Sequence, residues 1–413
     1  MRHRTRQPHP AGGGVGLVTR PTAQHLDEFR ARVRTFIAEN APPFQAREGH
    51  RAPVDATQEK QLRTWFAALF EAKLIGADWP VEHGGRADHH PLYDRIVSEE
   101  ILRARAPRPV DQVNLAAHVL LHFGSDEQKR TYLPAIRRSE HVWCQLLSEP
   151  DAGSDIAAVR SRAVRLPDGT WRVDGQKTWI TDGHWADMGL ALLRTDPAAV
   201  RHHGLSVFVV PLSAPGVEVR PIRTIGDAIE VNEVFLTDVR LPAENLIGAE
   251  GQGWSIIMAG LDFERFGIGG NVILLELLID DLLTLARHLQ VDGRPAIEVA
   301  DIRQRIAELA VEVEVAKAFI DDHVEQLING REQPGDSSIA KLSFAETYHT
   351  VAAYGADLAS WGTSFQPADS PVAQARQRLR ECWLWSRAYT ISGGSSEMMR
   401  NILAKRRLKL PTT

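Results

Sequence analysis

Two short segments of the chain combine residue types that can hold a flat, anionic ligand. The segment 146–155 reads Leu-Leu-Ser-Glu-Pro-Asp-Ala-Gly-Ser-Asp, and its Gly153 and Ser154 allow backbone N–H groups to turn toward an anion such as a pyrophosphate. About 30 residues later come Trp179, an indole that can cover a flat heterocycle, and Thr181, a hydroxyl that can bond a ring nitrogen. Either segment alone is more often an ordinary turn or core strand. Together, around one β-rich region, they indicate a binding site.

Composition restricts the class of protein that could carry this site. The chain has 413 residues, enough for about three domains at roughly 150 residues each, and 43% of them are apolar. Its net charge of −5 argues against nucleic-acid binding, which usually needs a basic surface. No apolar run approaches the roughly 20 residues that span a bilayer, so we expect no membrane span. The basic N-terminus leads into Gly12, Gly13 and Gly14 rather than an apolar run, so we expect no secretory signal and a cytoplasmic location.

Cysteine usage adds a further restriction. Cys144 and Cys382 are the two cysteines of the chain, too few for a disulfide framework or a zinc site. The histidines show no metal-ligand spacing, so we expect no metal site.

Hydrophobic periodicity changes twice along the chain and predicts an α+β fold that is mostly helical. Residues 1–20, rich in Arg, Pro and Gly, are expected to be a disordered tail. A helical domain is predicted for 21–141, an antiparallel β-domain for 142–251 and a helical bundle for 252–413. The predicted helices are 22–41, 57–73, 91–105, 113–123, 126–138, 254–289, one through 302–320, 337–360, 372–391 and 395–408. The predicted strands are 171–173, 178–180, 189–193, 205–210, 217–221 and 231–236.

Six motifs in this order resemble the acyl-CoA dehydrogenase family over nearly the whole chain. They are Trp-Pro-Val-Glu-His-Gly-Gly at 79–85, Gly-Ser-Asp-Glu-Gln-Lys at 124–129, Ser-Glu-Pro-Asp-Ala-Gly-Ser-Asp at 148–155, Trp-Ile-Thr at 179–181, Asn-Glu-Val-Phe at 232–235 with Asp-Val-Arg-Leu-Pro at 238–242, and Gly-Gln-Gly-Trp at 251–254. The stretch 392–401, Ser-Gly-Gly-Ser-Ser-Glu-Met-Met-Arg-Asn, is similar to the C-terminal ending of bacterial members. The resemblance implies an N-terminal helical domain, a central β-domain and a C-terminal four-helix bundle, with FAD held between domains.

The resemblance also implies roles for individual residues. Leu147 and Ser148 would lie at the pyrimidine side of the isoalloxazine, Trp179 would pack against it, and Thr181 would reach its N5 region. The remaining residues that it assigns to FAD are Gly153 and Ser154 at the pyrophosphate, with Ser154 also near the substrate, and Ser395 and Glu397 at the ADP half.

The implied reaction is the α,β-dehydrogenation of an acyl thioester to the trans-2-enoyl thioester, typical of lipid metabolism. A carboxylate takes the α-proton and flavin N5 takes the β-hydrogen as hydride. Many members place the base just before the Gly-Thr of the C-terminal motif, where this chain has Gly393. A branch similar to isovaleryl-CoA dehydrogenase places it on the first bundle helix, at the position of Glu264. We therefore expect Glu264 to be the base, with Asp262 and Arg265 facing the CoA moiety.

Gly267, Gly269 and Gly270 follow this base inside a predicted helix, where each glycine costs roughly 1 kcal/mol relative to alanine. They favour either close helix packing or room for an acyl chain beside the base. The chain also departs from the family, because the stretch 287–293 lacks the usual Arg-x-x-Phe and residues 358–362 lack the usual Gly run.

Several functions and partners stay open at this point. The substrate is expected to be an acyl-CoA or an acyl-carrier-protein thioester, and the electron acceptor an electron-transferring flavoprotein. The alternatives are a flavin oxygenase or oxidase, a carrier-protein-specific dehydrogenase, and a non-catalytic subunit of a heteromeric enzyme. The chain is expected to form a homo-oligomer or a hetero-oligomer with a related subunit.

Overall fold

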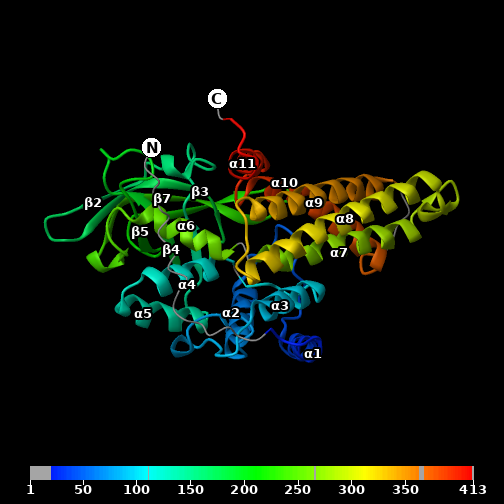
Figure 1. The fold of residues 1–413 in the computed structure, drawn as a ribbon, viewed down its shortest axis with the longest axis horizontal. Coiled ribbons are helices and arrows are strands. Elements are labelled where there is room, and N and C mark those ends of the chain that lie inside the picture. Colours follow the sequence, from blue (N-terminus) through cyan, green and yellow to red (C-terminus); the bar gives the residue numbers. More distant parts are fainter. Residues whose placement is uncertain (1–19, 110, 265–266, 362–366, 412–413) are drawn as a thin grey trace.

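The computed structural model describes residues 20–109, 111–264, 267–361 and 367–411, without the side chains of 111–114, 262–264 and 267–269. Apart from Arg20, the expected disordered tail therefore lies outside the described residues. Figure 1 shows three parts: a β-sheet, a group of helices beneath it, and an elongated bundle of long helices beside it. This arrangement confirms the predicted mostly helical α+β fold with a central sheet.

The N-terminal part consists of five helices that pack their apolar faces together. Its helices are α1 (Ala23–Asn40), α2 (Ala56–Glu71), α3 (Pro91–Arg103), α4 (Asp111–Phe123) and α5 (Asp126–Arg137). The Thr22 and Asp55 side chains cap α1 and α2, and Ser125 forms a reciprocal capping box with Gln128 at the start of α5. These caps explain why the predicted boundaries were close, because each cap is a local sequence signal.

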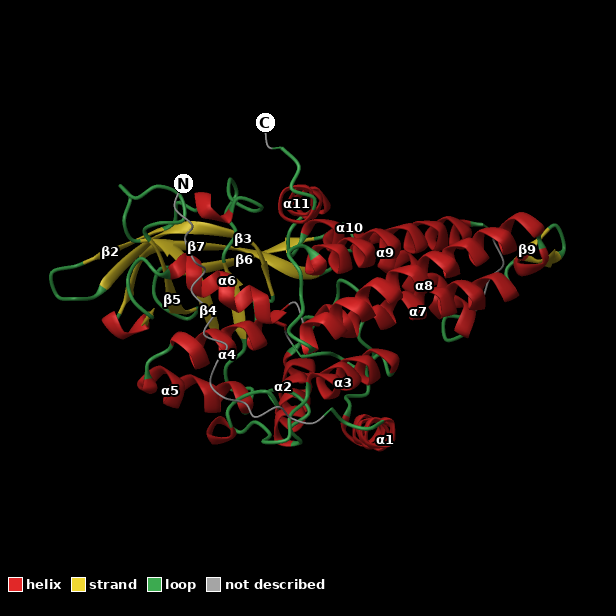
Figure 2. Cartoon of the chain, viewed as in Figure 1, coloured by secondary structure: helices red, strands yellow, loops and turns green. Residues whose placement is uncertain are grey.

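The central sheet contains the predicted strands, together with three that were not predicted, Trp143–Leu146, Arg162–Arg165 and Leu246–Ile247, and it is not wholly antiparallel. Its strands are β1 (Trp143–Leu146), β2 (Arg162–Arg165), β3 (Trp171–Thr181), β4 (Met188–Arg194), β5 (Leu205–Pro211), β6 (Val217–Arg223), β7 (Ile229–Leu241) and β8 (Leu246–Ile247). They form the sheet drawn in yellow in Figure 2. Their order is β6-β7-β3-β2-β4-β5-β8, with β1 paired to β4. The pairs β1–β4 and β2–β4 are parallel, and the other pairs of this sheet are antiparallel.

Strand β3 corrects one prediction, because the two short strands expected at 171–173 and 178–180 form one long strand. The Asp174-Gly175 pair between them, which is typical of a turn, instead marks a register shift in the pairing with β7. A Cβ atom at Gly175 would lie 2.2 Å from the Ser161 Oγ. Glycine is therefore needed here because the backbone of β3 approaches its neighbour closely.

The C-terminal part is a bundle in which α7 to α10 lie side by side (Figure 1). Its helices are α6 (Gly253–Glu264), α7 (Gly267–His288), α8 (Ala300–Ile328), α9 (Asp336–Ser360), α10 (Pro371–Ile391) and α11 (Ser396–Ile402). The shorter elements are β9 (Gln290–Val291), β10 (Arg294–Pro295), the 3₁₀ turns Val81–His83, Ile156–Ala158, Ala243–Asn245 and Ala296–Glu298, and the π-turn Leu403–Arg407. Both described parts of the helix predicted for 254–289 are helical, as α6 and α7, and residues 265–266 between them lie outside the described residues.

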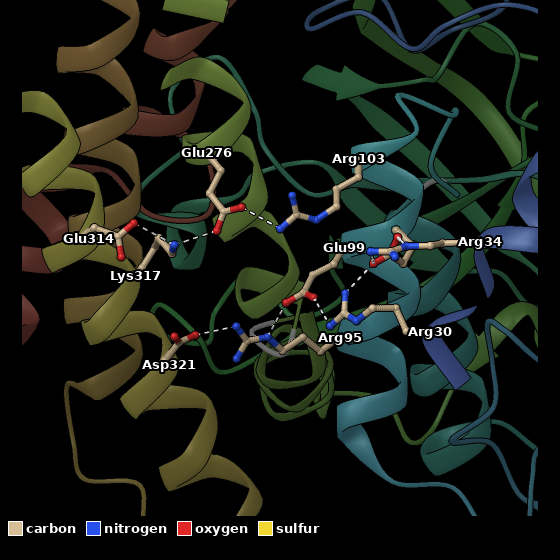
Figure 3. Close-up of polar contacts among 10 residues, drawn as sticks. Arg30, Arg34, Arg95, Glu99, Arg103, Glu276, Glu314, Lys317 and Asp321 are labelled. Atoms are coloured by element: carbon tan, nitrogen blue, oxygen red, sulfur yellow. Dashed lines mark hydrogen bonds and ion pairs between the residues drawn. The ribbon is translucent and has the colours of Figure 1, made fainter. Parts of the chain in front are cut away.

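A chain of ion pairs joins the N-terminal helices to the bundle. Arg95 of α3 contacts Asp321 of α8 at 2.6 Å, while Arg103 of α3 and Lys317 of α8 share the carboxylate of Glu276 on α7, at 2.7 and 2.8 Å (Figure 3). Helices α3 and α7 also pack closely. A Cβ atom at Gly270 of α7 would lie 2.2 Å from the Ser98 Oγ of α3. Gly270, the last glycine of the run at 267–270, therefore allows α7 to pack closely against α3.

None of the helices in the described part of the chain combines the length and the apolarity that a membrane crossing requires. Within the same residues, no three His, Cys, Asp or Glu side chains lie together in an arrangement that could hold a metal ion.

Candidate active site

The two segments singled out in the sequence lie against each other in the structure. Thr178 of β3 donates its backbone N–H to the Ser148 carbonyl at 3.0 Å, and the Lys177 ammonium donates to the Leu147 carbonyl at 3.1 Å. Leu147 is buried and Ser148 is half-buried at the end of β1. The residues expected at the pyrimidine side of a flavin are therefore placed beside the strand that carries Trp179 and Thr181.

Trp179 is held outward by an irregular stretch of β3. Its φ angle is +60°, and the pairing of β3 with β7 shifts register between Lys177 and Ile180. The indole is 64% exposed, an unusual state for a large apolar side chain within a strand. A flat, uncovered indole next to the half-buried Thr181 fits a planar heterocycle such as an isoalloxazine ring.

The loop that follows Ser148 has an open backbone at its glycine. Glu149 and Ala152 close a tight turn through two 3.0 Å backbone hydrogen bonds. A Cβ atom at Gly153 would meet nothing within 4 Å, and Ser154 is exposed. The backbone at Gly153 and Ser154 is therefore accessible, as a pyrophosphate site requires. A separate open hollow of about 310 Å³ lies between the two ends of this loop and β3, and neither Gly153 nor Ser154 lines it.

The C-terminal motif forms a turn that starts α11. Gly393 and Gly394 have φ angles of +63° and +95°, a conformation that glycine adopts readily. The Ser395 hydroxyl caps α11 by accepting the Met398 N–H at 3.3 Å, and Lys341 of α9 donates to the Gly394 carbonyl at 2.7 Å. The two predicted ADP contacts, Ser395 at the cap and Glu397 in the first turn of α11, therefore follow a turn that Lys341 of α9 contacts.

The side chains of the proposed base and its neighbours lie outside the described residues. Glu264 is the last residue of α6, but its side chain and that of Asp262 lie outside the described residues, as does Arg265 entirely. Their assignment therefore stays a prediction.

Three residues that support the segments with the predicted ligand contacts were not predicted from the sequence: Glu149, Lys177 and Lys341. A lysine within a strand is a weak signal of such a role. Its acceptors come from distant segments and leave no local pattern.

Comparison with known proteins places all three parts in one family. The models described as acyl-CoA dehydrogenase N-terminal, middle and C-terminal domains match residues 23–140, 144–239 and 251–408. The chain is 36% identical over 396 residues to the acyl-CoA dehydrogenase IpdE1 of Mycobacterium tuberculosis, covering 94% of this chain and 98% of that protein. The chain belongs to the acyl-CoA dehydrogenase family. The predicted family is therefore confirmed.

Other members of the acyl-CoA dehydrogenase family are similar over most of their length. Glutaryl-CoA dehydrogenase of Desulfococcus multivorans is 30% identical over 365 residues, which cover 85% of this chain and 90% of that protein. The solved structure named Tcur3481-Tcur3483 steroid ACAD matches with a TM-score of 0.83 at 26% identity, covering 95% of this chain and 99% of that one. The ChsE4-ChsE5 complex of Mycobacterium tuberculosis matches with a TM-score of 0.81 at 25% identity, covering 96% and 100%.

Membership of the family settles the broad chemistry. Acyl-CoA dehydrogenases are FAD-dependent flavoproteins of lipid metabolism that oxidise a CH–CH bond. The predictions of an oxidoreductase and of FAD as cofactor are therefore confirmed. The exposed indole of Trp179 and the open backbone at Gly153 fit this cofactor.

Proposed function

We propose that this chain dehydrogenates an acyl thioester between Cα and Cβ, with Glu264 as the base that removes the α-proton. The observation that supports this assignment is the conformation of the alternative slot. Gly393 has a φ angle of +63°, which L side chains rarely adopt, so that turn is built for glycine rather than for a glutamate base. Glu264 occupies the other position at which the family places a base.

The proposed chemistry requires this carboxylate, hydrogen-bond donors for the substrate, and FAD. The α-proton is weakly acidic, so the enolate-like oxygen needs hydrogen-bond donors, and the base must be ionised near neutral pH. FAD, when bound, supplies the acceptor for the β-hydrogen. The residues proposed to hold it are Leu147, Ser148, Gly153, Ser154, Trp179, Thr181, Ser395 and Glu397.

The substrate is proposed to bind on the side of the base. Asp262 and Arg265, which flank Glu264, would face the CoA moiety, and Ser154 would lie near the thioester. The substrate class is an acyl-CoA or an acyl-carrier-protein thioester, and an electron-transferring flavoprotein is the proposed acceptor. The relatives named as acyl-CoA dehydrogenases support the first of the two thioesters.

The enzyme is proposed to work as an oligomer. Val311, Val315 and Phe319 of α8 are exposed at four-residue spacing, so one side of the bundle carries an apolar stripe. A second copy or a related chain would cover such a stripe, and a related solved structure is named as a complex of two chains. Light scattering of the purified chain, alone and with a candidate partner, would distinguish the two assemblies.

Anaerobic flavin bleaching with a panel of acyl-CoA thioesters tests the proposal. We expect one thioester to bleach the wild-type flavin band, and Glu264→Gln to keep its FAD but bleach roughly 10³-fold more slowly. Glu250→Gln, which changes an exposed glutamate in the loop before α6, serves as the matched control. If Glu264→Gln bleaches at the wild-type rate, Glu264 is not the base.

A further inference from the structure

A lysine lies fully buried inside the central sheet, directly behind the proposed flavin contacts. The Lys177 side chain has 0% exposure. Its ammonium donates to the Glu149 carboxylate at 2.8 Å, to the Leu192 carbonyl at 2.8 Å and to the Leu147 carbonyl at 3.1 Å. An ammonium has three N–H donors, so each of them has an acceptor here.

These three acceptors belong to three different segments. Leu147 follows β1, Leu192 lies within β4, and Glu149 begins the loop that continues to Gly153. The Glu149 carboxylate also accepts the backbone N–H groups of Arg160 and Ser161, at 2.6 and 2.9 Å, where that loop ends. Lys177 and Glu149 therefore tie both ends of the loop and two strands to one point on β3.

The contact with Leu147 fixes the direction of a peptide plane. In a trans peptide the carbonyl and the next N–H point in opposite directions, so a Leu147 carbonyl turned toward Lys177 aims the Ser148 N–H away from it. The Ser148 carbonyl is fixed separately by the Thr178 N–H. Two residues after Lys177, the register shift of β3 turns Trp179 outward. The same lysine thus anchors both the Ser148 and the Trp179 side of the candidate site.

We infer that Lys177, held by Glu149, is a positioning residue for the flavin. It orients the Ser148 peptide toward the pyrimidine edge of the flavin, and it fixes the position of Trp179 relative to the isoalloxazine ring. The inference rests on the proposed flavin contacts at Ser148, Trp179 and Thr181, and it does not depend on which carboxylate is the base.

The ionisation of Lys177 provides a way to observe this role. Burial lowers the pKa of Lys177 to about 8, and the Glu149 carboxylate opposes that change. Among the described residues, Glu149 is the charged group that shifts the pKa of Lys177. The other two acceptors, at the end of β1 and in β4, are uncharged backbone carbonyls. Below about pH 8 the ammonium supplies three donors. Above it the neutral amine supplies two N–H donors for three acceptors, so one of the anchored segments is released.

The first experiment titrates the FAD-loaded wild-type protein from about pH 6 to about pH 10, following the flavin absorption band and the fluorescence of released FAD. We expect a reversible change of both signals centred near pH 8. Glu149→Gln removes the opposing negative charge, so it should move this midpoint to lower pH. A flavin band and FAD retention that stay constant over this range would overturn the inference.

Variants of the lysine provide a second, independent readout. We expect Lys177→Met to abolish the titration and to raise the dissociation constant for FAD at least about tenfold, with Lys177→Arg recovering part of the loss. Lys60→Met, the same change on an exposed position of α2, should leave both signals unchanged. Retention of FAD with an unaltered titration in Lys177→Met would also overturn the inference, and if that variant does not fold, the wild-type and Glu149→Gln titrations decide.

These measurements are separable from the test of Glu264. FAD retention and its pH dependence do not require proton abstraction, so a wrong base would leave them intact. Conversely, a constant flavin band would refute the role of Lys177 and leave the bleaching result with Glu264→Gln unaffected.

Discussion

The phenol hydroxyl of Tyr389 donates a 2.9 Å hydrogen bond to the Glu48 carboxylate, which joins α10 to the loop after α1. Nearby, Arg51 of the same loop contacts Glu230 of β7 at 2.8 Å, and the Glu230 carbonyl accepts the Asp182 N–H at 2.8 Å. All three parts of the molecule therefore meet in one polar junction. This junction adjoins the end of β3, where Thr181 lies.

The Glu48 carboxyl should make the stability of the protein depend on pH. Burial raises the pKa of Glu48 above its ordinary value of 4.5, although the Arg108 charge opposes this. The folded protein then holds this proton more tightly than the unfolded chain. As a result, the free energy of unfolding decreases as pH rises from 4.5 through the raised folded-state value. In Glu48→Gln, whose amide oxygen can still accept from Tyr389, this decrease should be absent.

Urea unfolding at several pH values from about 4 to about 8 checks this prediction. The difference in stability between Glu48→Gln and wild type should shift in favour of the variant as pH rises. Glu39→Gln, the same change on the exposed face of α1, is the matched control. Parallel pH curves for wild type and Glu48→Gln would contradict the prediction.

Glu276 is expected to contribute more to stability than a surface glutamate. It accepts from both Arg103 and Lys317, and its side chain is 25% exposed, whereas Glu314, which also contacts Lys317, is 70% exposed. Glu276→Gln should lower the free energy of unfolding by about 1–2 kcal/mol, and Glu314→Gln by less than about 0.5 kcal/mol. Denaturant unfolding at low and high salt measures both. The larger loss should shrink in high salt, and equal losses would mean that the shared carboxylate adds nothing.

Thr181 is proposed to reach the flavin N5 region, so its hydroxyl should matter more for reduction than for cofactor binding. Thr181→Ala should slow flavin bleaching by about tenfold, the effect of one lost hydrogen bond, while the dissociation constant for FAD changes little. Stopped-flow absorbance and FAD titration measure the two quantities. The control is Thr170→Ala, which removes a hydroxyl that donates to Asp168 in a hairpin. Unchanged reduction kinetics in Thr181→Ala would remove this residue from the reaction.

Lys341 is expected to support the ADP half of the cofactor. Its ammonium donates to the Gly394 carbonyl at 2.7 Å, next to the proposed contacts Ser395 and Glu397. Lys341→Met should loosen this turn and raise the dissociation constant for FAD about tenfold. Release of FAD on dilution, followed by fluorescence, gives the result. Lys405→Met, at an exposed position in the turn after α11, should release FAD as slowly as wild type, and equal behaviour of the two variants would refute the role.

Local patterns predicted the helices well because helix formation leaves a signal in neighbouring residues. The buried positions of α8 include Ile302, Ile306, Leu309 and Val313, which are the apolar positions whose spacing predicted that helix. The valines at 311 and 315 are exposed, so the strand-like alternation within this helix was correctly outweighed by the longer period.

Contacts between distant segments could not be predicted in the same way. Asp174-Gly175 has the composition of a turn, but its glycine is needed for a close approach to Ser161, which periodicity does not reveal. Lys177 binds groups from three segments, and lysines are rarely buried, so sequence gave no reason to expect its role. Glu264 was assigned from family motifs alone, since an isolated Glu-Arg pair on a helix is typical of a solvated face.

The close approach of Gly270 to Ser98 implies that these two positions vary together. A methyl group at 270 would lie 2.2 Å from the Ser98 Oγ and 2.5 Å from the Ser98 Cβ, so it has no room unless α3 retreats from α7 or residue 98 loses its side chain. Relatives with alanine at the position of Gly270 should therefore carry glycine at that of Ser98, whereas any side chain at both positions requires the helices to separate. Pairwise substitution statistics across the family would reveal this coupling without any purified protein.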